Sequence, residues 1–308
     1  AMAADPLTCG LPPYIANVVT TESLEWAGGP DNGPKLARLA FGCLRPYGGT
    51  LAMTIPGDDG ATGFIQEVTT MKLPGARAQV ADGLAVVRRE GALPGSADWT
   101  HEYGDPSNSL MSQDQLVRAP LGVLWFGGPA SDGSLFYNRH FWGPSMAVID
   151  GRMFIEGPQV FAAIDVYTGR VLWKIQLPEG TSPGRRGNFF EQVRVGFHYV
   201  VASDYIYFSD GNSCKLLDPA TGKTVKELTL PSTEQRWGRM RISNDLLSDA
   251  TRDDKTDPGI LHFFAAYGFN NRVTPLSFAH LRIEACGLKR LDKWIDMRVE
   301  LKDVSLPC

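Results

Sequence analysis

Hydrophobic residues in the first third of the chain follow a helical period that alternates with strand-like runs. Leu36, Leu39, Ala40 and Cys43 recur at intervals of three or four residues, which places them on one face of a helix over residues 35–44. The full expected order is a strand at 14–19, the helix at 35–44, a strand at 51–55, a helix at 62–71 and an antiparallel pair over 76–89 that turns at Asp82-Gly83. Helices that alternate with strands predict an α/β unit.

The pattern changes after residue 116, where short β-rich runs separated by Gly, Pro and Asp replace the helical period. Here the chain repeats itself, because residues 160–173 align without a gap with residues 213–226. Each copy has a strand that ends in Asp, at Asp165 or Asp218, then a Thr-Gly pair and a returning strand. The Asp carboxylate can accept hydrogen bonds from the turn N–H groups, and the Gly supplies the positive φ of a tight turn. Each copy is therefore predicted to be a β-hairpin.

A second strand pair precedes each hairpin. The runs lie at 146–149 and 153–156 in the first unit and at 199–202 and 206–209 in the second, with turns at Asp150-Gly151 and Asp204. Four antiparallel strands per unit are typical of a β-propeller blade, but two blades with flanking strands cannot close a ring of roughly four to eight. Because open strand edges recruit other strands, we expect a homo-oligomer or completion by the missing parts of a longer parent chain.

The first unit resembles the blades of pyrroloquinoline-quinone (PQQ) dehydrogenases and of outer-membrane assembly lipoproteins. Asp165, Thr168, Gly169 and Trp173 match the last two strands of those blades, whereas Lys226 replaces the Trp in the second unit. In the family this Trp docks neighbouring blades, so the resemblance implies that one such contact is lost at Lys226. Three flanking segments also resemble propeller parts: Leu124-Trp125 a closing strand of a preceding blade, residues 236–242 an opening strand of a following blade, and residues 99–108 the segment that leads into a quinoprotein propeller.

The N-terminal unit resembles a different family. Residues 43–50 (CLRPYGGT) resemble a turn late in class I S-adenosylmethionine-dependent methyltransferases, and the elements over 12–90 resemble the C-terminal half of that domain. No GxGxG loop, which would let backbone N–H groups approach the cofactor, occurs before Pro46. We therefore expect no independent methyl transfer. The whole layout resembles bacterial hybrid quinoprotein-like proteins of planctomycete type.

These patterns predict a mixed fold in three parts. Residues 1–94 are expected to form a partial methyltransferase-like α/β segment, a Rossmann-like half, and residues 95–250 to form all-β propeller blades. A linker of small residues marks the boundary near Pro94. The tail over 251–308 has no confident interpretation, although residues 261–269 favour a strand pair and residues 282–302 favour a helix.

Charge and composition exclude several classes of protein. The net charge is −4 and no run of Lys or Arg exceeds two residues, so nucleic acid and anionic membranes are not expected partners. No apolar run approaches the ~20 residues of a membrane helix, so no membrane insertion is expected, and the N-terminus lacks the pattern of a signal peptide. Five scattered cysteines without a CxxC pair predict buried thiols rather than a disulfide framework or a zinc site.

The propeller resemblance implies a PQQ cofactor over a Trp floor with a Ca²⁺ ion nearby. It also implies an envelope compartment such as the periplasm, whereas the methyltransferase-like piece implies the cytoplasm. This chain lacks the adjacent cysteines that often accompany such a site, and packing between blades explains Trp125 and Trp173 better. We therefore expect no complete cofactor site, and PQQ and Ca²⁺ are implied by resemblance alone. No HxH or HExxH spacing indicates a metal site.

Six side chains are candidates for a site at the propeller mouth. Two interpretations stay open for several of them: Glu156 is either a residue of a rim or channel or a solvated turn carboxylate, and Arg186 either grips an anionic ligand or lies in a solvated loop. His101 has no partner pattern and is expected to be structural. The expected catalytic residues are His140 and Glu156, and the expected ligand-binding residues are Arg139, Arg186, Asn188 and His198.

The function that fits these features is a quinoprotein-like β-propeller module that binds a small-molecule ligand or serves in assembly. The alternative class is an enzyme. It would be either a PQQ-type oxidoreductase completed in an oligomer or a promiscuous hydrolase of esters, lactones or phosphotriesters, with or without the assistance of a metal. No GxSxG nucleophile elbow occurs anywhere in the chain.

Overall fold

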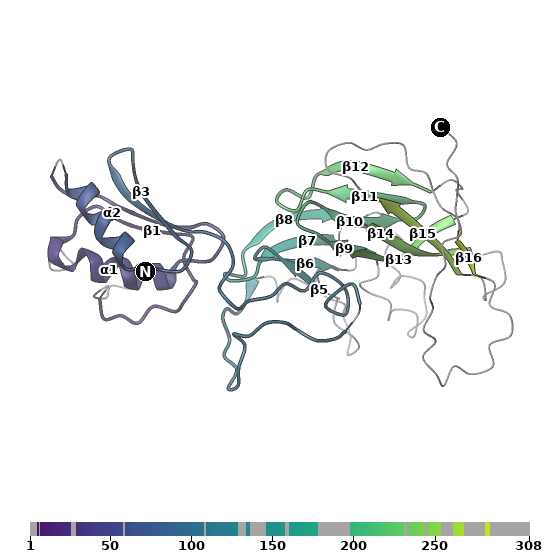
Figure 1. Ribbon diagram of the computed structural model, residues 1–308, viewed down its shortest axis with the longest axis horizontal. Coiled ribbons are helices and arrows are strands. Elements are labelled where there is room, and N and C mark those ends of the chain that lie inside the picture. The colour runs from purple at the N-terminus through teal and green to yellow at the C-terminus, as the bar shows by residue number, and fades with distance from the viewer. Residues whose placement is uncertain are drawn as a thin grey trace.

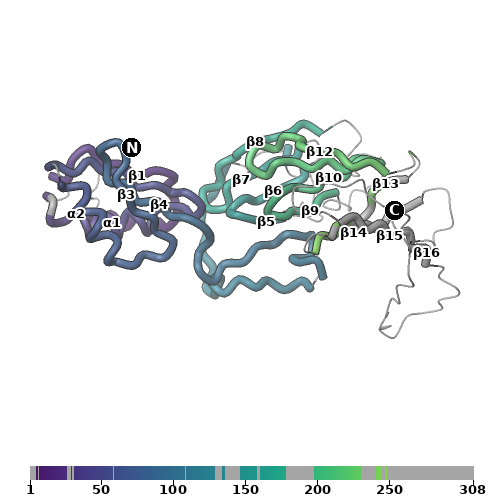
Figure 2. The backbone as a smooth tube through the Cα atoms, turned by 45° about the horizontal axis from the view of Figure 1, so that its top comes forward, coloured from purple at the N-terminus to yellow at the C-terminus, as the bar shows by residue number. Residues whose placement is uncertain are grey.

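The computed structural model places a small α/β unit at one end of the molecule and three β-sheets at the other, and the long loop that joins them in the sequence runs along one side of the sheets (Figures 1 and 2). Every sheet, including that of the α/β unit, has four strands. The description covers residues 5–283 except for residues 6, 26–28, 58, 108, 129–133, 136–145, 158–159, 178–197, 231–232, 234, 244–245, 254–260 and 268–280, and residues 1–4 and 284–308 also lie outside it.

The α/β unit contains the elements in the order that the hydrophobic pattern predicts, but the first strand is β1 at Val18–Thr21 rather than at 14–19. Its sheet has the order β1-β2-β4-β3, in which β1 and β2 are parallel and the β3–β4 hairpin is antiparallel to β2. The hairpin turns at Asp82 and Gly83, which both have positive φ, as expected. The elements are β1 (Val18–Thr21), the short 3-10 helix η2 (Pro30–Asn32), α1 (Gly33–Cys43), β2 (Gly49–Met53), α2 (Gly60–Thr70), β3 (Ala76–Ala81) and β4 (Leu84–Arg89).

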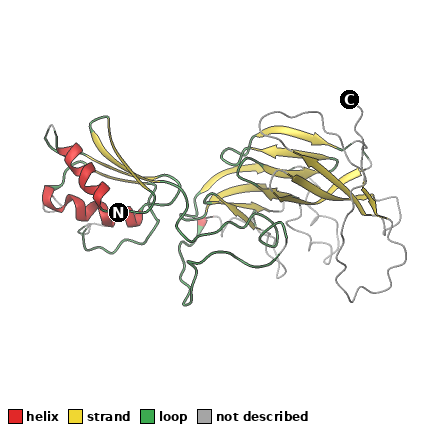
Figure 3. Ribbon diagram, viewed as in Figure 1, coloured by secondary structure: helices red, strands yellow, loops and turns green. Residues whose placement is uncertain are grey.

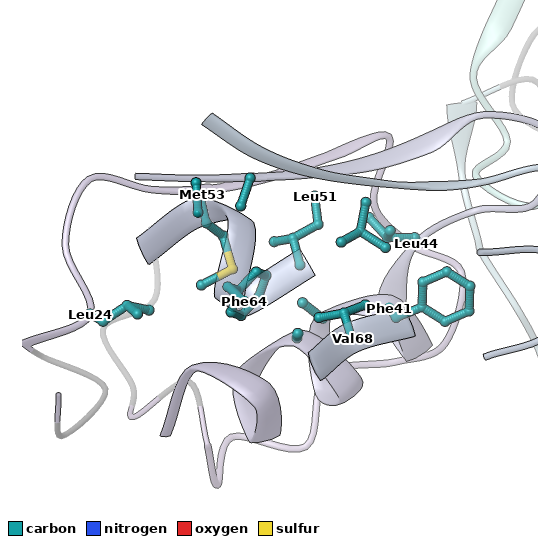
Figure 4. Close-up of a cluster of buried hydrophobic side chains, with 12 residues drawn as sticks. Leu24, Phe41, Leu44, Leu51, Met53, Phe64 and Val68 are labelled. Carbon is teal, nitrogen blue, oxygen red and sulfur yellow. The ribbon is translucent and has the colours of Figure 1, made fainter. Parts of the chain in front are cut away.

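One hydrophobic core holds this unit together, between the two helices and the sheet (Figure 4). Leu51 and Met53 of β2 pack against Phe64 and Val68 of α2, and all four are buried. Burial of each such side chain contributes about 1.5–3 kcal/mol. The prediction that Leu39 lies on the buried face of α1 is wrong, because its side chain is 42% exposed. Ala40 is buried as predicted, and Ala37 and Phe41 are buried with it.

The rest of the described chain forms three antiparallel sheets of four strands each, consistent with propeller blades. In each sheet the strands follow one another in chain order. The first sheet is β5 (Met146–Ile149), β6 (Arg152–Glu156), β7 (Val160–Asp165) and β8 (Val171–Gln176). The second is β9 (Tyr199–Val201), β10 (Ile206–Asp210), β11 (Ser213–Leu217) and β12 (Thr224–Thr229), and the third is β13 (Gln235–Ser243), β14 (Leu246–Asp253), β15 (Leu261–Tyr267) and β16 (Leu281–Ile283).

The third sheet extends past residue 250, where the sequence pattern did not assign a structure. Because β15 and β16 pair with each other and β15 pairs with β14, this sheet contains part of the expected tail. The expected strand pair over 261–269 is a single strand, β15, within the described residues. The expected helix over 282–302 lies outside the described residues except for Arg282 and Ile283, which belong to β16.

The predicted Asp/Thr-Gly corners are present in both repeats. In the first, Asp165 Oδ1 accepts hydrogen bonds from the backbone N–H groups of Tyr167 and Thr168, and in the second Asp218 Oδ1 accepts them from the N–H and the hydroxyl of Thr221. The glycine of each corner has a positive φ, 69° and 71°. These local hydrogen bonds close the hairpins without any help from the neighbouring sheet.

An indole ring covers each of these glycines. A Cβ atom at Gly222 would lie 2.8 Å from the ring of Trp173, and one at Gly169 would lie 2.5 Å from the ring of Trp125. Only glycine therefore allows the ring to lie against the corner. Trp173 belongs to the first sheet and Gly222 to the second, so this contact docks the two sheets.

Residues 99–104, the lead-in segment, connect the first strands of the three sheets. Trp99 exchanges two backbone hydrogen bonds with Val148 in β5, at 2.8 and 2.7 Å. The carbonyl of Thr100 accepts one from the N–H of Val201 in β9 at 3.1 Å. His101 provides the third connection, because its Nε2 accepts a hydrogen bond from an N–H in β13 at 3.0 Å.

His101 must be neutral to make that connection. Its Nε2 accepts from the N–H of Ile242, so the ring proton lies on Nδ1, which is 2.8 Å from Thr100 Oγ1. Burial, with the charge of Arg241 in the same direction and that of Asp105 opposing, lowers the pKa of His101 from 6.5 to about 4. The prediction that His101 is structural agrees with these contacts.

The α/β unit packs against the first sheet through the corner at Asp165. Arg45 Nε lies 2.8 Å from Asp165 Oδ2 in an ion pair rather than an aligned hydrogen bond, and the Asp165 side chain is fully buried. The rings of Tyr14 and Tyr167 meet edge to face at 5.7 Å. Asp165 therefore uses one oxygen to close its own hairpin and the other to hold the neighbouring unit.

The pH dependence of stability tests the role of His101. A histidine whose pKa is lowered by folding contributes stability above about pH 6.5, and this is lost as the pH falls toward 4. We expect the free energy of unfolding to drop by about 3 kcal/mol more between pH 7 and pH 4 in the wild type than in His101→Gln, which does not titrate. Urea unfolding at both pH values measures this difference, and equal losses in the two proteins would contradict the assignment.

Candidate functional site

Glu156 and His198 form the one carboxylate–histidine hydrogen bond between the first and second sheets in the described part of the chain. Glu156 Oε1 lies 2.7 Å from His198 Nδ1. Glu156 is the last residue of β6, and His198 directly precedes β9. The pair therefore exists only because the two sheets are docked.

The carboxylate of this pair is buried. The Glu156 side chain is 2% exposed and that of His198 is 23% exposed. Among the described residues no group hydrogen-bonds to the buried Glu156 Oε2. The solvated-turn interpretation of Glu156 is therefore wrong. A buried carboxylate oxygen normally has a hydrogen-bond partner, so Oε2 is the position in this pair where a ligand group or an ordered water would be stabilised.

The pair raises the pKa of the histidine. Burial alone would lower the pKa of His198, but the hydrogen bond that its Nδ1–H donates to Glu156 and the negative charges of Glu156 and Asp210 together outweigh it. The pKa therefore lies above its usual value of 6.5, so the imidazolium of His198 persists to a higher pH than that of a free histidine. A charged histidine beside a buried carboxylate can donate a proton or hold an anionic group through Nε2.

Sequence reasoning missed the residues that position this pair. Ser209 fixes the backbone of His198, because its N–H and its hydroxyl both donate to the His198 carbonyl, at 2.6 and 3.1 Å. Tyr199 is buried, its hydroxyl donates to the Phe154 carbonyl at 2.8 Å, and burial and the charge of Glu156 raise its pKa well above 10. A Tyr directly after His198 at a strand start was the only sequence signal available, and it is weak.

The other four candidates lie outside the described residues. These are Arg139, His140, Arg186 and Asn188, so the structure neither joins them to the pair nor separates them from it. Of the six expected site residues, it brings together Glu156 and His198.

The described residues do not fit the cofactor that the propeller resemblance implies. Trp125 and Trp173 both lie against corner glycines, and their indole N–H groups donate to the carbonyls of Val166 and Pro219, so neither forms an open floor for a quinone ring. No group of three or more His, Cys, Asp or Glu side chains in the described part could hold a metal ion. A search of the same residues finds no helix that is both long and apolar enough to span a membrane.

No protein-family model matches the chain, and no curated protein sequence matches it. Several solved structures are similar in part. They include a quinohemoprotein alcohol dehydrogenase from Pseudomonas putida HK5, with 20% identity over 40% of this chain and 18% of that protein at a TM-score of 0.31. The quinohemoprotein alcohol dehydrogenase from Comamonas testosteroni has 18% identity over 55% of this chain and 25% of that protein at a TM-score of 0.37. BamB from Moraxella catarrhalis has 12% identity over 40% of this chain and 37% of that protein at a TM-score of 0.28. The chain spans less than two fifths of the length of each, and identities this low concern the fold alone.

Titration of His198 and His101 distinguishes the site from the scaffold. We expect the pKa of His198 to lie above 6.5 in the wild type and to be lower in Glu156→Gln, because only the charge of Asp210 then opposes the effect of burial. The raised pKa also means that the pair stabilises the fold at low pH and that this contribution is lost as the pH rises through the folded pKa. NMR titration of the imidazole protons measures both values.

His101 is the internal control for that titration. Its pKa of about 4 should be the same in both proteins, because it lies in the lead-in segment and its shift has causes other than Glu156. A His198 pKa that does not change in Glu156→Gln would show that the hydrogen bond does not form in solution.

Proposed function

We propose that this chain is a ligand-binding β-propeller module in which Glu156 and His198 are the polar anchor for a small molecule. The observation that carries the proposal is the buried carboxylate oxygen Glu156 Oε2, to which no described residue hydrogen-bonds. Ligand sites in proteins combine mostly apolar walls with a few placed polar groups of this kind. Phe154, Phe161 and Tyr199 form a buried apolar cluster between the same two sheets, next to the pair.

The chemistry of the pair suggests the class of ligand. A carboxylate oxygen accepts hydrogen bonds only, so it selects a hydroxyl, an amine or another donor. When His198 is protonated, its Nε2 also donates, so it then selects an acceptor on the same molecule. A small polar compound with a donor beside an acceptor, such as a polyol or an amino alcohol, satisfies both groups.

We also propose that the α/β unit is a methyltransferase-like half without methyl transfer, used here as a structural partner of the propeller. Its parallel β1–β2 pair followed by an antiparallel hairpin supports that resemblance. The ion pair between Arg45 and the buried Asp165 supports the structural role, because it engages the residue that closes the first corner.

A second candidate function is acid–base hydrolysis. A histidine oriented by a buried carboxylate is the arrangement that positions a general acid or base. Glu156 holds His198 Nδ1, which leaves Nε2 for proton transfer. Hydrolysis of p-nitrophenyl esters, lactones or phosphotriesters by the wild type but not by His198→Asn would favour this candidate.

Ligand-detected NMR with a defined panel tests the binding function. The panel contains glycerol, ethanolamine, a set of hexitols, short primary alcohols, and PQQ with CaCl₂. We expect at least one polyol or amino alcohol to bind the wild type and to bind Glu156→Gln about 10–100-fold more weakly, since a hydrogen bond to a charged group contributes about 1.5–3 kcal/mol.

The control is Asp204→Asn, which neutralises an exposed turn carboxylate between β9 and β10 and should leave binding unchanged. Equal affinities of the wild type and Glu156→Gln for every panel compound, or no binding at all, would reject the anchor. Dye-linked oxidation of an alcohol after addition of PQQ and CaCl₂ would instead identify an enzyme.

A further inference from the structure

Tyr47 has a backbone conformation that a large side chain rarely adopts. Its φ is 57°, in the left-handed region, and it lies in the turn that leads from α1 into β2. An aromatic residue is strained in this region, and such strain persists only where the surrounding structure stabilises it. The hydrophobic core of the α/β unit does not include Tyr47. The contacts that stabilise its conformation therefore lie outside that core.

The ring of Tyr47 lies on a turn of the first sheet. A Cβ atom at Gly151, between β5 and β6, would lie 2.6 Å from the ring of Tyr47 and 3.4 Å from that of Tyr167. Gly151 is buried and has a positive φ of 71°. Trp173 makes the same kind of contact with Gly222, where a Cβ would lie 2.8 Å from the ring. The α/β unit therefore docks on the first sheet in the way that the first sheet docks on the second.

The turn at Gly151 and the corner at Asp165 form one surface of the first sheet. The carbonyl of Gly151 accepts a hydrogen bond at 3.1 Å from the N–H of Val166, the residue after Asp165. Arg45, two residues before Tyr47, pairs with Asp165 on this surface at 2.8 Å. The α/β unit meets the sheet here with loop residues, drawn green in Figure 3. One short loop thus contacts both turns at this end of the sheet.

The hydroxyl of Tyr47 lies in the same seam. Burial raises the pKa of Tyr47 to about 12, and the charges of Asp98, Tyr167 and Asp150 act in the same direction, with Arg152 opposing. All four of these residues follow the α/β unit in the chain. The phenol therefore stays neutral at ordinary pH and can be buried without the cost of an ionised group.

This surface is at the opposite end of β6 from the candidate site. Arg152 directly follows Gly151 and pairs with Asp165, whereas Glu156 pairs with Phe161 at the other end of the strand. Four residues of strand span roughly 13 Å. The α/β unit therefore covers the end of the first sheet that does not hold Glu156.

We propose that Tyr47 is the anchor of an interaction surface through which the α/β unit docks on the first sheet, with Gly151 as its receptor. The left-handed conformation of Tyr47 is what directs its ring onto that glycine. The partner that the surface fits is a strand turn with a glycine of positive φ, which the chain's own β5–β6 turn supplies. This inference rests on the structural role proposed for the α/β unit and is independent of the ligand site.

Tyr47→Gly tests the anchor, because a residue that served only its own turn would respond differently. Glycine adopts a φ of 57° without strain, so a turn residue could be replaced with no loss of stability. An anchor could not be replaced in this way. In differential scanning calorimetry we expect the wild type to unfold in one transition that includes both units, and Tyr47→Gly to unfold in two, because the units are no longer coupled.

Gly151→Ala changes the other partner of the contact. Its methyl group would meet the ring of Tyr47, so we expect two transitions here as well. Gly211→Ala is the matched control, since Gly211 has a similar φ of 66° in the β10–β11 turn but has no atom within 4 Å of its Cβ position. The control pays the same conformational penalty and should keep the single transition.

The possible outcomes separate the anchor from the structural role on which it rests. Two transitions in the wild type would overturn both. A single transition in the wild type that persists in Tyr47→Gly and Gly151→Ala would overturn the anchor and leave the structural role intact. Two transitions in Gly211→Ala would also overturn the anchor, because the effect would then arise from the glycine conformation rather than from the ring.

Discussion

The arrangement of this protein depends on one contact, an indole ring that lies flat against a glycine in a Thr-Gly corner. Glycine is required there twice, for its positive φ and because a Cβ would collide with the ring. The indole N–H also donates to the carbonyl that follows the corner aspartate. Because local hydrogen bonds alone form the corner, its glycine is already in the conformation against which the neighbouring indole packs.

The candidate site and the junction between the two units are both consequences of this docking. Glu156 ends a strand of the first sheet and His198 precedes a strand of the second, so their hydrogen bond forms only when the sheets are in place. Asp165 closes its corner with one oxygen and holds Arg45 of the α/β unit with the other. The buried carboxylates Glu156 and Asp165 therefore lie where two parts of the structure meet, and in each case a side chain of the neighbouring part pairs with the charge.

Turns that close through hydrogen bonds between near neighbours could be predicted from the sequence, whereas contacts between different sheets could not. The corners at Asp165 and Asp218 were predictable because all their hydrogen bonds form within a few residues. Leu39 was assigned to the core because helical periodicity alone does not say which face meets a sheet. Glu156 and His198 were both chosen as candidates, but their pairing depends on how the sheets dock, which no local pattern encodes. Strands β15 and β16 were not recognised as parts of a blade because they lack an Asp/Thr-Gly corner.

A double-mutant cycle between Trp173 and Gly222 measures the central contact most directly. The account predicts that Gly222→Ala costs about 1–3 kcal/mol more of unfolding free energy in the wild type than in Trp173→Ala, where the new methyl group meets no ring. Gly211→Ala, at a similar φ of 66° with open space around it, should show no coupling to Trp173→Ala. Additive losses for Trp173 and Gly222 would contradict the account, because the indole would then not be pressed against the corner.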